Sequence, residues 1–452
     1  MKSLFFLLLT VFCTSAFSAD YTASSCSYAD VNTAYGLASD GDRVLIPTCT
    51  STDWTTNTLT VSKAVQIIGN GVGNTILVNA KFTVTVADGK SWRISGFETS
   101  GTTGFNVTGC SKSGRMDNIK FTGGVTGFTD NRVFWLSPSS GCYNAGLIDH
   151  IEFAPGSAQI NSIQIHVREG DGGNNSYYRP LDLGGADAWY IEDSTFMQNE
   201  SFYNVSAPLT DCDGGGRFVF RHNTVRSNYI EMHDAIVDGI RSCRKWEVYD
   251  NTWTTTSEQY YASGAWAQFA IRGGTGVAFN NTFTFAGDTP SVIIFSAYRT
   301  EQAGGTPWGT CPNTNKVCMF NLTIATSCTT DTQCSSFSGS CQTIDGNGRG
   351  TGLSGYPCRD QMGTDGVSGG QQQIRPALFW NNKVGTTQYD PAYSGTGLST
   401  YLAVNRDYCV GTGGGATQPT TCAGRAVPYT SYTYPHPLQT PTQAPKKPTG
   451  AS

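Results

Sequence analysis

Arginine recurs after short apolar runs, and this recurrence marks where chemistry could take place. The segments HVREG, GIRSC, AIRGG and AYRTE place Arg168, Arg241, Arg272 and Arg299 at one position of a repeating unit, and LTDCD offers Asp211 there. If these segments stack as β-strands, successive copies lie ~4.8 Å apart. Guanidinium groups that close repel one another unless an anion lies between them, and Arg binds carboxylates and sulfates through paired hydrogen bonds. The pattern predicts a binding face for an acidic polysaccharide.

A local enrichment of basic residues points to the same region. The chain has 29 Lys and Arg in 452 residues, so about two are expected by chance in the window of 29 residues from Arg217 to Lys245. The window instead holds Arg217, Arg221, Arg226, Arg241, Arg244 and Lys245. We expect exposed side chains that line a groove beside a polar rim loop at Gly170–Gly185. The candidate catalytic residues are His233, Arg241, Lys245 and Asp211, and the candidate substrate-binding residues are Arg168, Arg272, Arg299 and His166.

Other interpretations of these residues stay open. The arginines would equally suit solvated turns in which they pair with local Asp and Glu. A glycoside hydrolase needs paired carboxylates, and four acids are close in sequence: Asp211, Asp213, Asp234 and Asp238. Another position of the repeating unit holds polar residues that could act as a general base or could satisfy the backbone of a turn: His150, Asp193, His222, Asp250 and Asn280. Bound Ca²⁺ is compatible with this chemistry, but no calcium motif occurs, so the metal and the cofactor are unknown.

An eight-residue phrase predicts the elements that position these residues. It reads WYIEDSTF, FVFRHNTV, WEVYDNTW and GVAFNNTF, starting at Trp189, Phe218, Trp246 and Gly276, so successive starts lie 29, 28 and 30 residues apart. Weaker copies start at Arg115 and Gly146. A period of this size marks one supersecondary unit stacked many times.

The residues within the phrase indicate β-strands. Its third and eighth positions are apolar, as Ile191 and Phe196 show, and alternation along a strand would point them inward. Between them runs a polar column that we expect to stack where the chain turns: Ser194, Asn223, Asn251 and Asn281. No stretch has the 3.6-residue period of a helical solenoid, and a propeller blade needs about 40 residues. The sequence predicts an all-β fold, a single-stranded right-handed parallel β-helix.

The N-terminal region carries a resemblance to a known family. Between Tyr28 and Leu77 the chain reads AYGLASDGDRVLIPTCTSTDW and then LTVSKAVQIIGNGVGNTIL. These segments resemble the first turns of pectate-lyase-like right-handed β-helix proteins, and the resemblance covers most of residues 26–384. It implies a short capping helix at Tyr28–Ala38, a first strand at Val44–Pro47 and a second at Val65–Asn70. It specifies the fold better than the function, because one fold hosts many activities.

The N-terminus and the cysteines indicate export. Residues 1–19, MKSLFFLLLTVFCTSAFSA, read as a signal peptide with a charged start, a short apolar run and a small-residue cleavage site. Removing Cys13 from 15 cysteines leaves 14, an even number that suits disulfide pairing in an oxidising compartment. The expected pairs are Cys212 with Cys243, Cys110 with Cys142, and Cys409 with Cys422. We predict a secreted protein with no membrane span.

The remaining segments define the expected organisation. The β-helix domain should span residues 20–438, with a Cys-rich loop at 311–373 and a disordered tail at 439–452. Tyr429–Leu438 is aromatic and Pro-rich, and we expect it to be an extended strap that covers the C-terminal end of the stack.

Composition narrows the function. Only 14% of residues are charged and the net charge is -5, which argues against nucleic-acid binding. We expect a monomeric extracellular carbohydrate-active protein that binds an acidic polysaccharide and, as an enzyme, cleaves it by β-elimination. An Arg or His would neutralise the uronate carboxylate while a neighbouring base takes the C5 proton. The alternatives are a non-catalytic surface or matrix protein that uses the β-helix as a rigid rod, and a glycoside hydrolase.

Overall fold

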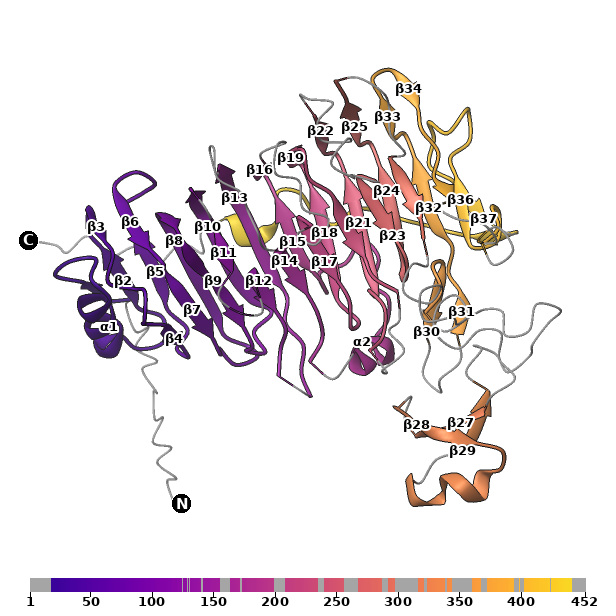
Figure 1. Cartoon of the computed structure of the whole chain (residues 1–452), viewed down its shortest axis with the longest axis horizontal. Helices are drawn as coiled ribbons and strands as arrows, with labels where there is room; N and C mark the ends of the chain where they lie inside the picture. The colour runs from indigo at the N-terminus through magenta and orange to yellow at the C-terminus, as the bar shows by residue number, and fades with distance from the viewer. Residues whose placement is uncertain are drawn as a thin grey trace, which may run out of the picture.

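Parallel strands stack rung on rung along one long axis (Figure 1). The computed structural model describes residues 18–440, with gaps of which the longest are 155–162, 199–207, 235–239, 256–266, 287–291, 297–315, 344–359 and 367–371. The arrangement confirms the predicted all-β parallel β-helix. Within the described residues, no helix is long and apolar enough to cross a membrane. The predicted signal peptide falls almost entirely on residues 1–17, outside the described residues.

A short helix lies at the N-terminal end of the stack, where the family resemblance implied one. Helix α1 (Tyr28–Leu37) is capped by Ser27, whose Oγ accepts a hydrogen bond from the Asp30 N–H at 3.1 Å. Its Val31 and Ala34 are buried in the core. The implied first strands are β2 (Arg43–Ile46) and β5 (Gln66–Gly69), which pair in parallel.

The first sheet runs along the whole stack and carries the repeated phrase. Its strands pair in parallel in the order β1 (Asp20–Thr22), β2, β5, β8 (Ser91–Ser100), β10 (Ser113–Thr122), β13 (Gly146–Ala154), β15 (Trp189–Glu192), β18 (Arg217–Arg221), β21 (Lys245–Tyr249), β24 (Thr275–Phe279), β32 (Ala377–Trp380) and β36 (Tyr408–Val410). The first residues of the four phrases are in register across β15, β18, β21 and β24. This confirms the predicted parallel stacking.

The sheet bends once in each rung. Beyond the bend lie β3 (Cys49–Ser51), β6 (Thr75–Val78), the second halves of β8, β10 and β13, and then β16 (Thr195–Met197), β19 (Thr224–Arg226), β22 (Thr252–Thr254), β25 (Thr282–Thr284) and β33 (Lys383–Val384), with β34 (Thr387–Gln388) antiparallel to β33. The bend residues have positive φ: Asn118, His150, Asp193, His222, Asp250, Asn280 and Asn381. Apart from Gly, mainly Asn, Asp and His tolerate this conformation. The His–Asp–Asn column of the sequence therefore meets a turn requirement.

The predicted polar ladder lies beside the bend. Its residues are buried on successive rungs, and Asn382 extends it: Ser194, Asn223, Asn251, Asn281 and Asn382. Asn223 Nδ2 donates to Asn251 Oδ1 at 3.2 Å, and Asn251 Nδ2 donates to Asn281 Oδ1 at 3.0 Å. Asn251 Nδ2 also reaches the Phe220 carbonyl at 2.9 Å, so the ladder satisfies turn backbone as predicted.

A second sheet closes the helix. Its parallel order is β4 (Leu59–Val61), β7 (Lys81–Val84), β9 (Thr102–Val107), β12 (Arg132–Leu136), β14 (Ile163–Val167), β17 (Thr210–Cys212), β20 (Ile230–Met232), β23 (Phe269–Ile271), β26 (Ile293–Phe295) and β35 (Ala392–Tyr393), with β11 (Thr126–Gly127) beside β9. Aromatic rings stack inside it from rung to rung: Phe82 and Phe105 have centroids 5.2 Å apart, and Phe105 and Phe134 5.0 Å apart.

Disulfides staple the stack. Cys110–Cys142, Cys212–Cys243 and Cys409–Cys422 are the predicted pairs, and Cys26–Cys49 is a further one. In the Cys-rich loop 311–373, the described backbone includes β27 (Lys316–Phe320), β28 (Thr323–Cys328), η2 (Asp331–Phe337), β29 (Ser340–Thr343) and the antiparallel pair β30 (Thr364–Gly366) and β31 (Gln372–Ile374). Elsewhere, α2 (Asn174–Tyr178) lies in the rim loop, and β37 (Thr421–Cys422) pairs with β38 (Arg425–Ala426).

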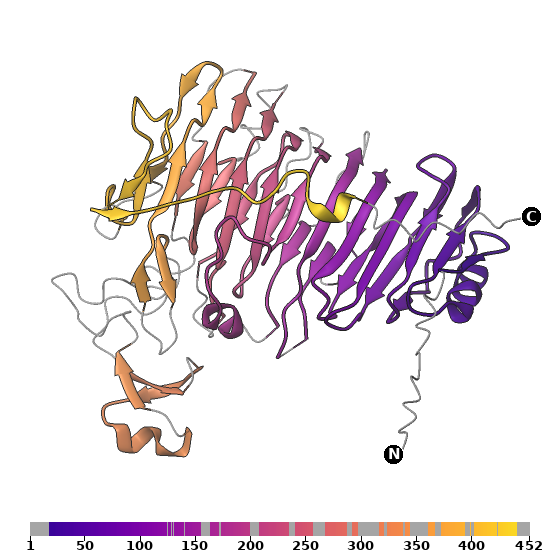
Figure 2. The same cartoon turned by 180° about the vertical axis from the view of Figure 1, so that it is seen from behind.

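The strap is not where the sequence placed it. Instead of covering the last rung, it runs back along the outer face of the first sheet and ends in η3 (Pro437–Gln439) (Figure 2). Its Tyr432 packs against outward residues of that sheet such as Tyr190, and Arg115 on β10 donates to the carbonyl of Leu438 at 3.0 Å. Apolar side chains on the outside of the first sheet explain the path, because burying them requires a cover. Of the predicted tail, residues 441–452 lie outside the described residues.

Candidate functional site

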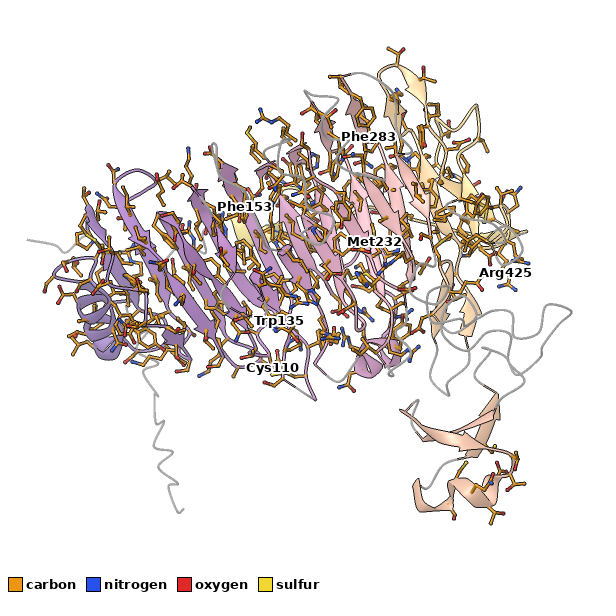
Figure 3. All side chains as sticks on the ribbon, viewed as in Figure 1. Cys110, Trp135, Phe153, Met232, Phe283 and Arg425 are labelled. Atoms are coloured by element: carbon orange, nitrogen blue, oxygen red, sulfur yellow. A yellow bond between two sulfur atoms is a disulfide. The ribbon has the colours of Figure 1, made fainter. Side chains whose placement is uncertain are left out.

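The outer face of the second sheet carries charged side chains on both sides of a core residue in successive rungs. The register aligns His166-Val167-Arg168, Asp211-Cys212-Asp213, Glu231-Met232-His233 and Ala270-Ile271-Arg272. The middle residues belong to the core, so the flanking residues point outward. Figure 3 labels Met232, on the strand of Glu231, and Trp135 on the N-terminal side of this group. Two polar columns result, and we call them the ion cluster: His166, Asp211 and Glu231 in one, and Arg168, Asp213, His233 and Arg272 in the other.

His166 is a cation held between two carboxylates. Its Nδ1 lies 3.1 Å from Asp211 Oδ2, and its Nε2 lies 3.2 Å from Asp213 Oδ1. Its ring stacks on Trp135 with centroids 4.8 Å apart. Burial lowers the pKa of His166, but the charges of Asp213 and Asp211 outweigh burial and raise it to about 9. Arg132 Nε is 3.0 Å from the same Nδ1, but a bond there requires the neutral ring, which the two carboxylates disfavour.

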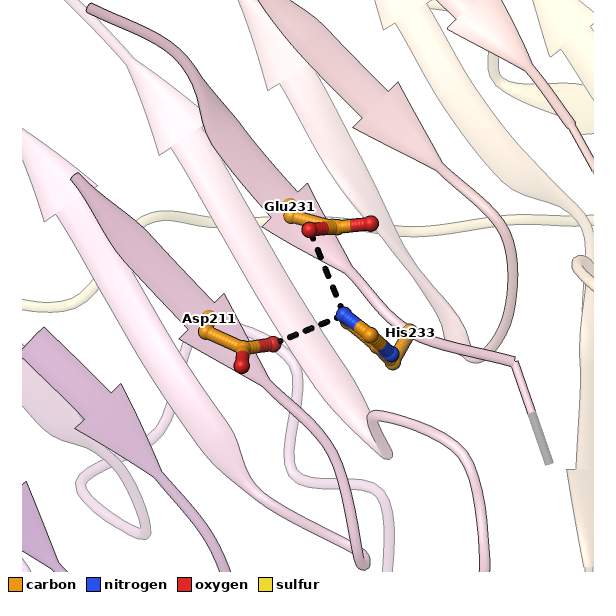
Figure 4. A group of neighbouring side chains, drawn as sticks. All are labelled: Asp211, Glu231 and His233. Atoms are coloured by element: carbon orange, nitrogen blue, oxygen red, sulfur yellow. Dashed lines mark ion pairs between the residues drawn. The ribbon is translucent and has the colours of Figure 1, made fainter. Parts of the chain in front are cut away.

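His233 has different neighbours. Its Nε2 lies 3.0 Å from Asp211 Oδ1 and 3.2 Å from Glu231 Oε2 (Figure 4). Its Nδ1 lies 2.5 Å from Arg272 Nη2. Because a guanidinium group only donates, Nδ1 must be the acceptor, and the ring proton is then on Nε2. In this arrangement His233 is a neutral imidazole whose N–H points toward two carboxylates.

The carboxylates of the ion cluster are ionised. Burial by itself raises the pKa of all three, but the neighbours lower it overall: the Nε2–H of His233 with the charges of His166 and Arg272 for Asp211, the charge of His166 for Asp213, and the Nε2–H of His233 with the charge of Arg272 for Glu231. Arg272 Nη1 lies 3.1 Å from Glu231, and Arg168 Nε lies 3.0 Å from Asp213. The cluster therefore combines ionised acids, fixed cations and one neutral imidazole.

The same residues could be taken for a metal site. Asp211, Glu231 and His233 each offer a ligand atom, and these atoms lie within 4.8 Å of one another. Carboxylate and imidazole ligands suit Zn²⁺ and other transition metals. A metal ion could bind His233 Nε2 only through the lone pair of that nitrogen. Because Nδ1 accepts the hydrogen bond from Arg272, the ring proton is on Nε2 and that lone pair is not free. As arranged, these groups form an ion cluster rather than a preformed metal site.

Several predicted site residues are elsewhere. Arg241 lies in the connection between β20 and β21, where both its bonds to Asp360 are 2.6 Å long. Lys245 is on the first sheet, and its Nζ donates to the carbonyls of Asp182 and Gly185. Arg299 lies outside the described residues. The predicted arginine column is therefore wrong at Arg241, and His233 occupies that position.

The predicted exposed basic surface is also wrong. Five of the six basic residues between 217 and 245 are buried, and the sixth, Arg226, is half-buried. Arg217 lies 2.7 Å from Asp187, Arg221 2.6 Å from Glu192, and Lys245 3.3 Å from Glu247. A buried charge is costly unless it is paired, which explains these partners. The alternative of pairing with acids is correct, although the pairs are buried rather than solvated.

The structure places five of the predicted site residues in the ion cluster: His166, Arg168, Asp211, His233 and Arg272. Asp211 was predicted in the arginine column, but the register sets it opposite His166, and Asp213 lies in that column instead. Sequence reasoning missed Glu231 as a site residue, and it missed the aromatic support of His166 by Trp135. A usable signal was present, because in three successive copies a core residue is flanked on both sides by ionisable residues.

We compared the chain with protein-family models, with curated proteins and with solved structures, and none matched. The functional argument therefore rests on the geometry of the ion cluster.

Proposed function

We propose that the protein is a secreted carbohydrate-active enzyme, pectate-lyase-like in fold, that cleaves an acidic polysaccharide by β-elimination at the ion cluster. The observation that carries the proposal is a neutral imidazole, His233, set between two carboxylates and an arginine on the outer face of the second sheet. The disulfides and the lack of a membrane-spanning helix in the described residues fit an extracellular protein.

Arginine supplies the recognition of a uronate. Arg272 is paired with Glu231 through Nη1, and a substrate carboxylate would compete for this guanidinium group by forming paired hydrogen bonds with it. Arg168 keeps 22% of its side chain exposed and offers a second cation in the same column, three rungs from Arg272. Glu231 and His233 retain 8% and 5% exposure, whereas His166 has none, so a sugar would touch Glu231 and His233 and not His166.

The proposed chemistry uses His233 as the base. When the substrate carboxylate draws Arg272 away, Nδ1 becomes available and takes the C5 proton, while Nε2–H stays bonded to Asp211 and Glu231. The C5–H electron pair forms the C4–C5 double bond, the C4–O4 bond breaks, and water protonates the leaving oxygen. The paired carboxylates stabilise the imidazolium that forms, and Arg272 stabilises the charge that develops on the uronate.

Hydrolysis fits the cluster less well. A glycoside hydrolase needs one carboxyl group that stays protonated near neutral pH, whereas the pKa values of Asp211, Asp213 and Glu231 are all lowered. Burial raises the pKa of Glu169 to about 6, but Arg179 binds its two oxygens at 2.9 and 3.4 Å. No described carboxyl group of the cluster is therefore set up as the acid.

The second candidate is a non-catalytic surface protein with a rigid β-helical body. The observation that favours it is burial, because a buried cluster of ion pairs also ties neighbouring rungs together without any substrate.

One assay separates these functions. The purified protein is incubated with alginate, pectate and glycosaminoglycans, with and without Ca²⁺, and the ultraviolet absorbance of the unsaturated product is followed. We expect a rise on one of these substrates that is lost in His233→Asn and kept in His150→Gln, a change at a bend on the other sheet. New reducing ends without that absorbance would indicate a hydrolase, and binding without either signal would indicate the surface protein.

A further inference from the structure

The strap, defined here as Val427–Gln439, covers the first sheet and not the sheet that carries the ion cluster (Figure 2). Beneath it lies an apolar cluster of outward-facing residues that includes Tyr190, Val219 and Tyr249. The strap follows Cys422, the last cysteine of the chain, so no disulfide can hold it. It depends on non-covalent contacts alone.

Buried charges bind the far part of the strap. Arg221, which has no exposed surface, donates to the carbonyls of Tyr432 and Thr433, at 2.8 Å each. Glu192 accepts from the backbone N–H of His436 at 2.8 Å and from Gln439 at 2.8 Å. Arg221 and Glu192 also pair with each other at 2.6 Å, so their charges are balanced within the sheet and the strap adds further hydrogen bonds to this ion pair.

His436 is the residue on which this end depends. It is 7% exposed, its ring lies 4.7 Å from that of Tyr190 and 5.4 Å from that of Tyr432, and its Nδ1 accepts from the Leu438 N–H at 3.1 Å. A proton on Nδ1 would remove that acceptor and uncap η3. It would also place a third positive charge near Arg221 and Arg115.

We infer that the strap is a proton-sensitive latch, in which protonation of His436 releases residues 434–440 and uncovers the part of the apolar face beneath Leu438 while the β-helix stays folded. Burial and the charges of Arg221 and Arg115 lower the pKa of His436 from 6.5 to about 4. Release therefore becomes easier as the pH falls below 6.5. The ratio of open to closed strap should rise about 30-fold between pH 7.5 and pH 5.

Two other titratable residues, His222 and Asp193, contact the strap near His436 through Tyr434. His222 stacks on Tyr434 with centroids 3.7 Å apart and lies 3.8 Å from Asp250. Asp193 accepts from the Tyr434 hydroxyl at 2.6 Å. Burial also lowers the pKa of His222, but His222 accepts no strap hydrogen bond in the described contacts, so its variant separates the effect of a stacked histidine from that of the acceptor His436.

Hydrogen–deuterium exchange of the full protein tests the latch at pH 7.5 and pH 5, with rates corrected by an unstructured peptide of the same sequence. We expect protection of residues 434–440 to fall about 30-fold at the lower pH, with β10 and β13 unchanged. His436→Gln should abolish this pH dependence, and His222→Gln should keep it. Equal protection at both pH values, or an unchanged fall in His436→Gln, would overturn the inference.

A second measurement covers the case in which His436→Gln opens the strap at every pH. Nuclear magnetic resonance of histidine-labelled wild-type protein, which has five histidines, follows the His436 ring directly. We expect it to titrate well below 6.5, and titration at or above 6.5 would overturn the latch. The result does not bear on the proposed β-elimination, because the strap and the ion cluster lie on different sheets.

Discussion

Raising the pH above neutrality should destabilise the protein through His166. The carboxylates of Asp213 and Asp211 raise its pKa from 6.5 to about 9 against the effect of burial. The folded protein therefore keeps a proton that the unfolded chain has lost, and the stabilisation is complete below pH 6.5 and disappears as the pH rises through 9. Linkage gives a loss of about 2 to 3 kcal/mol in the free energy of unfolding between these pH values.

Urea unfolding of wild-type protein and of His166→Gln, at steps from pH 6.5 to pH 9, measures this loss. Glutamine keeps one N–H donor but cannot titrate, so the difference between the two proteins should shrink by about 2 to 3 kcal/mol across the range. His150→Gln is the control, because the His150 side chain is 49% exposed at a bend on the first sheet, and it should follow the wild type. A wild-type minus His166→Gln difference that stays constant with pH would refute the reasoning.

Three further predictions concern stability and use the same urea assay. Asn251→Ala should cost about 2 to 4 kcal/mol, because it leaves the buried Phe220 carbonyl without its donor. Arg241→Ala should cost about 3 to 5 kcal/mol, because Asp360 stays buried without that cation, and Arg241→Ala with Asp360→Asn should recover part of the loss. Replacing Cys212 and Cys243 by Ala should cost about 3 to 4 kcal/mol, given their separation of 31 residues; an unchanged midpoint in any of the three would contradict the corresponding contact.

The repeated phrase could be located in the sequence because each of its positions has a strict local requirement. The bend needs a left-handed backbone, which restricts the residue before the ladder to types such as His222, Asp250 and Asn280. The next position must satisfy buried turn backbone, which favours Asn. These two constraints repeat in every phrase, so the register of the first sheet was readable.

The arginine column could not be aligned in the same way. Register partners on the second sheet are Cys212, Met232 and Ile271, so consecutive rungs are 20 and 39 residues apart, and Arg241 falls within the longer connection. Nor could its burial be read, because its partner Asp360 is 119 residues away. The sequence alone does not distinguish a basic residue that is exposed to solvent from one that is buried in an ion pair. The strap was misplaced for a similar reason, since its target is a surface formed only after the rungs stack.

The neighbours of each buried histidine, and not burial alone, decide which change of pH weakens the fold. Burial lowers the pKa of both His166 and His436, yet two carboxylates reverse the shift in His166 to about 9, whereas Arg221 and Arg115 add to it in His436 and bring it to about 4. The contribution of His166 is lost as the pH rises above 6.5, and that of neutral His436 is lost as the pH falls below 6.5. The sum of the two contributions is therefore largest near pH 6.5. Because the two residues lie on different sheets, acid should act first on the strap and alkali on the ion cluster.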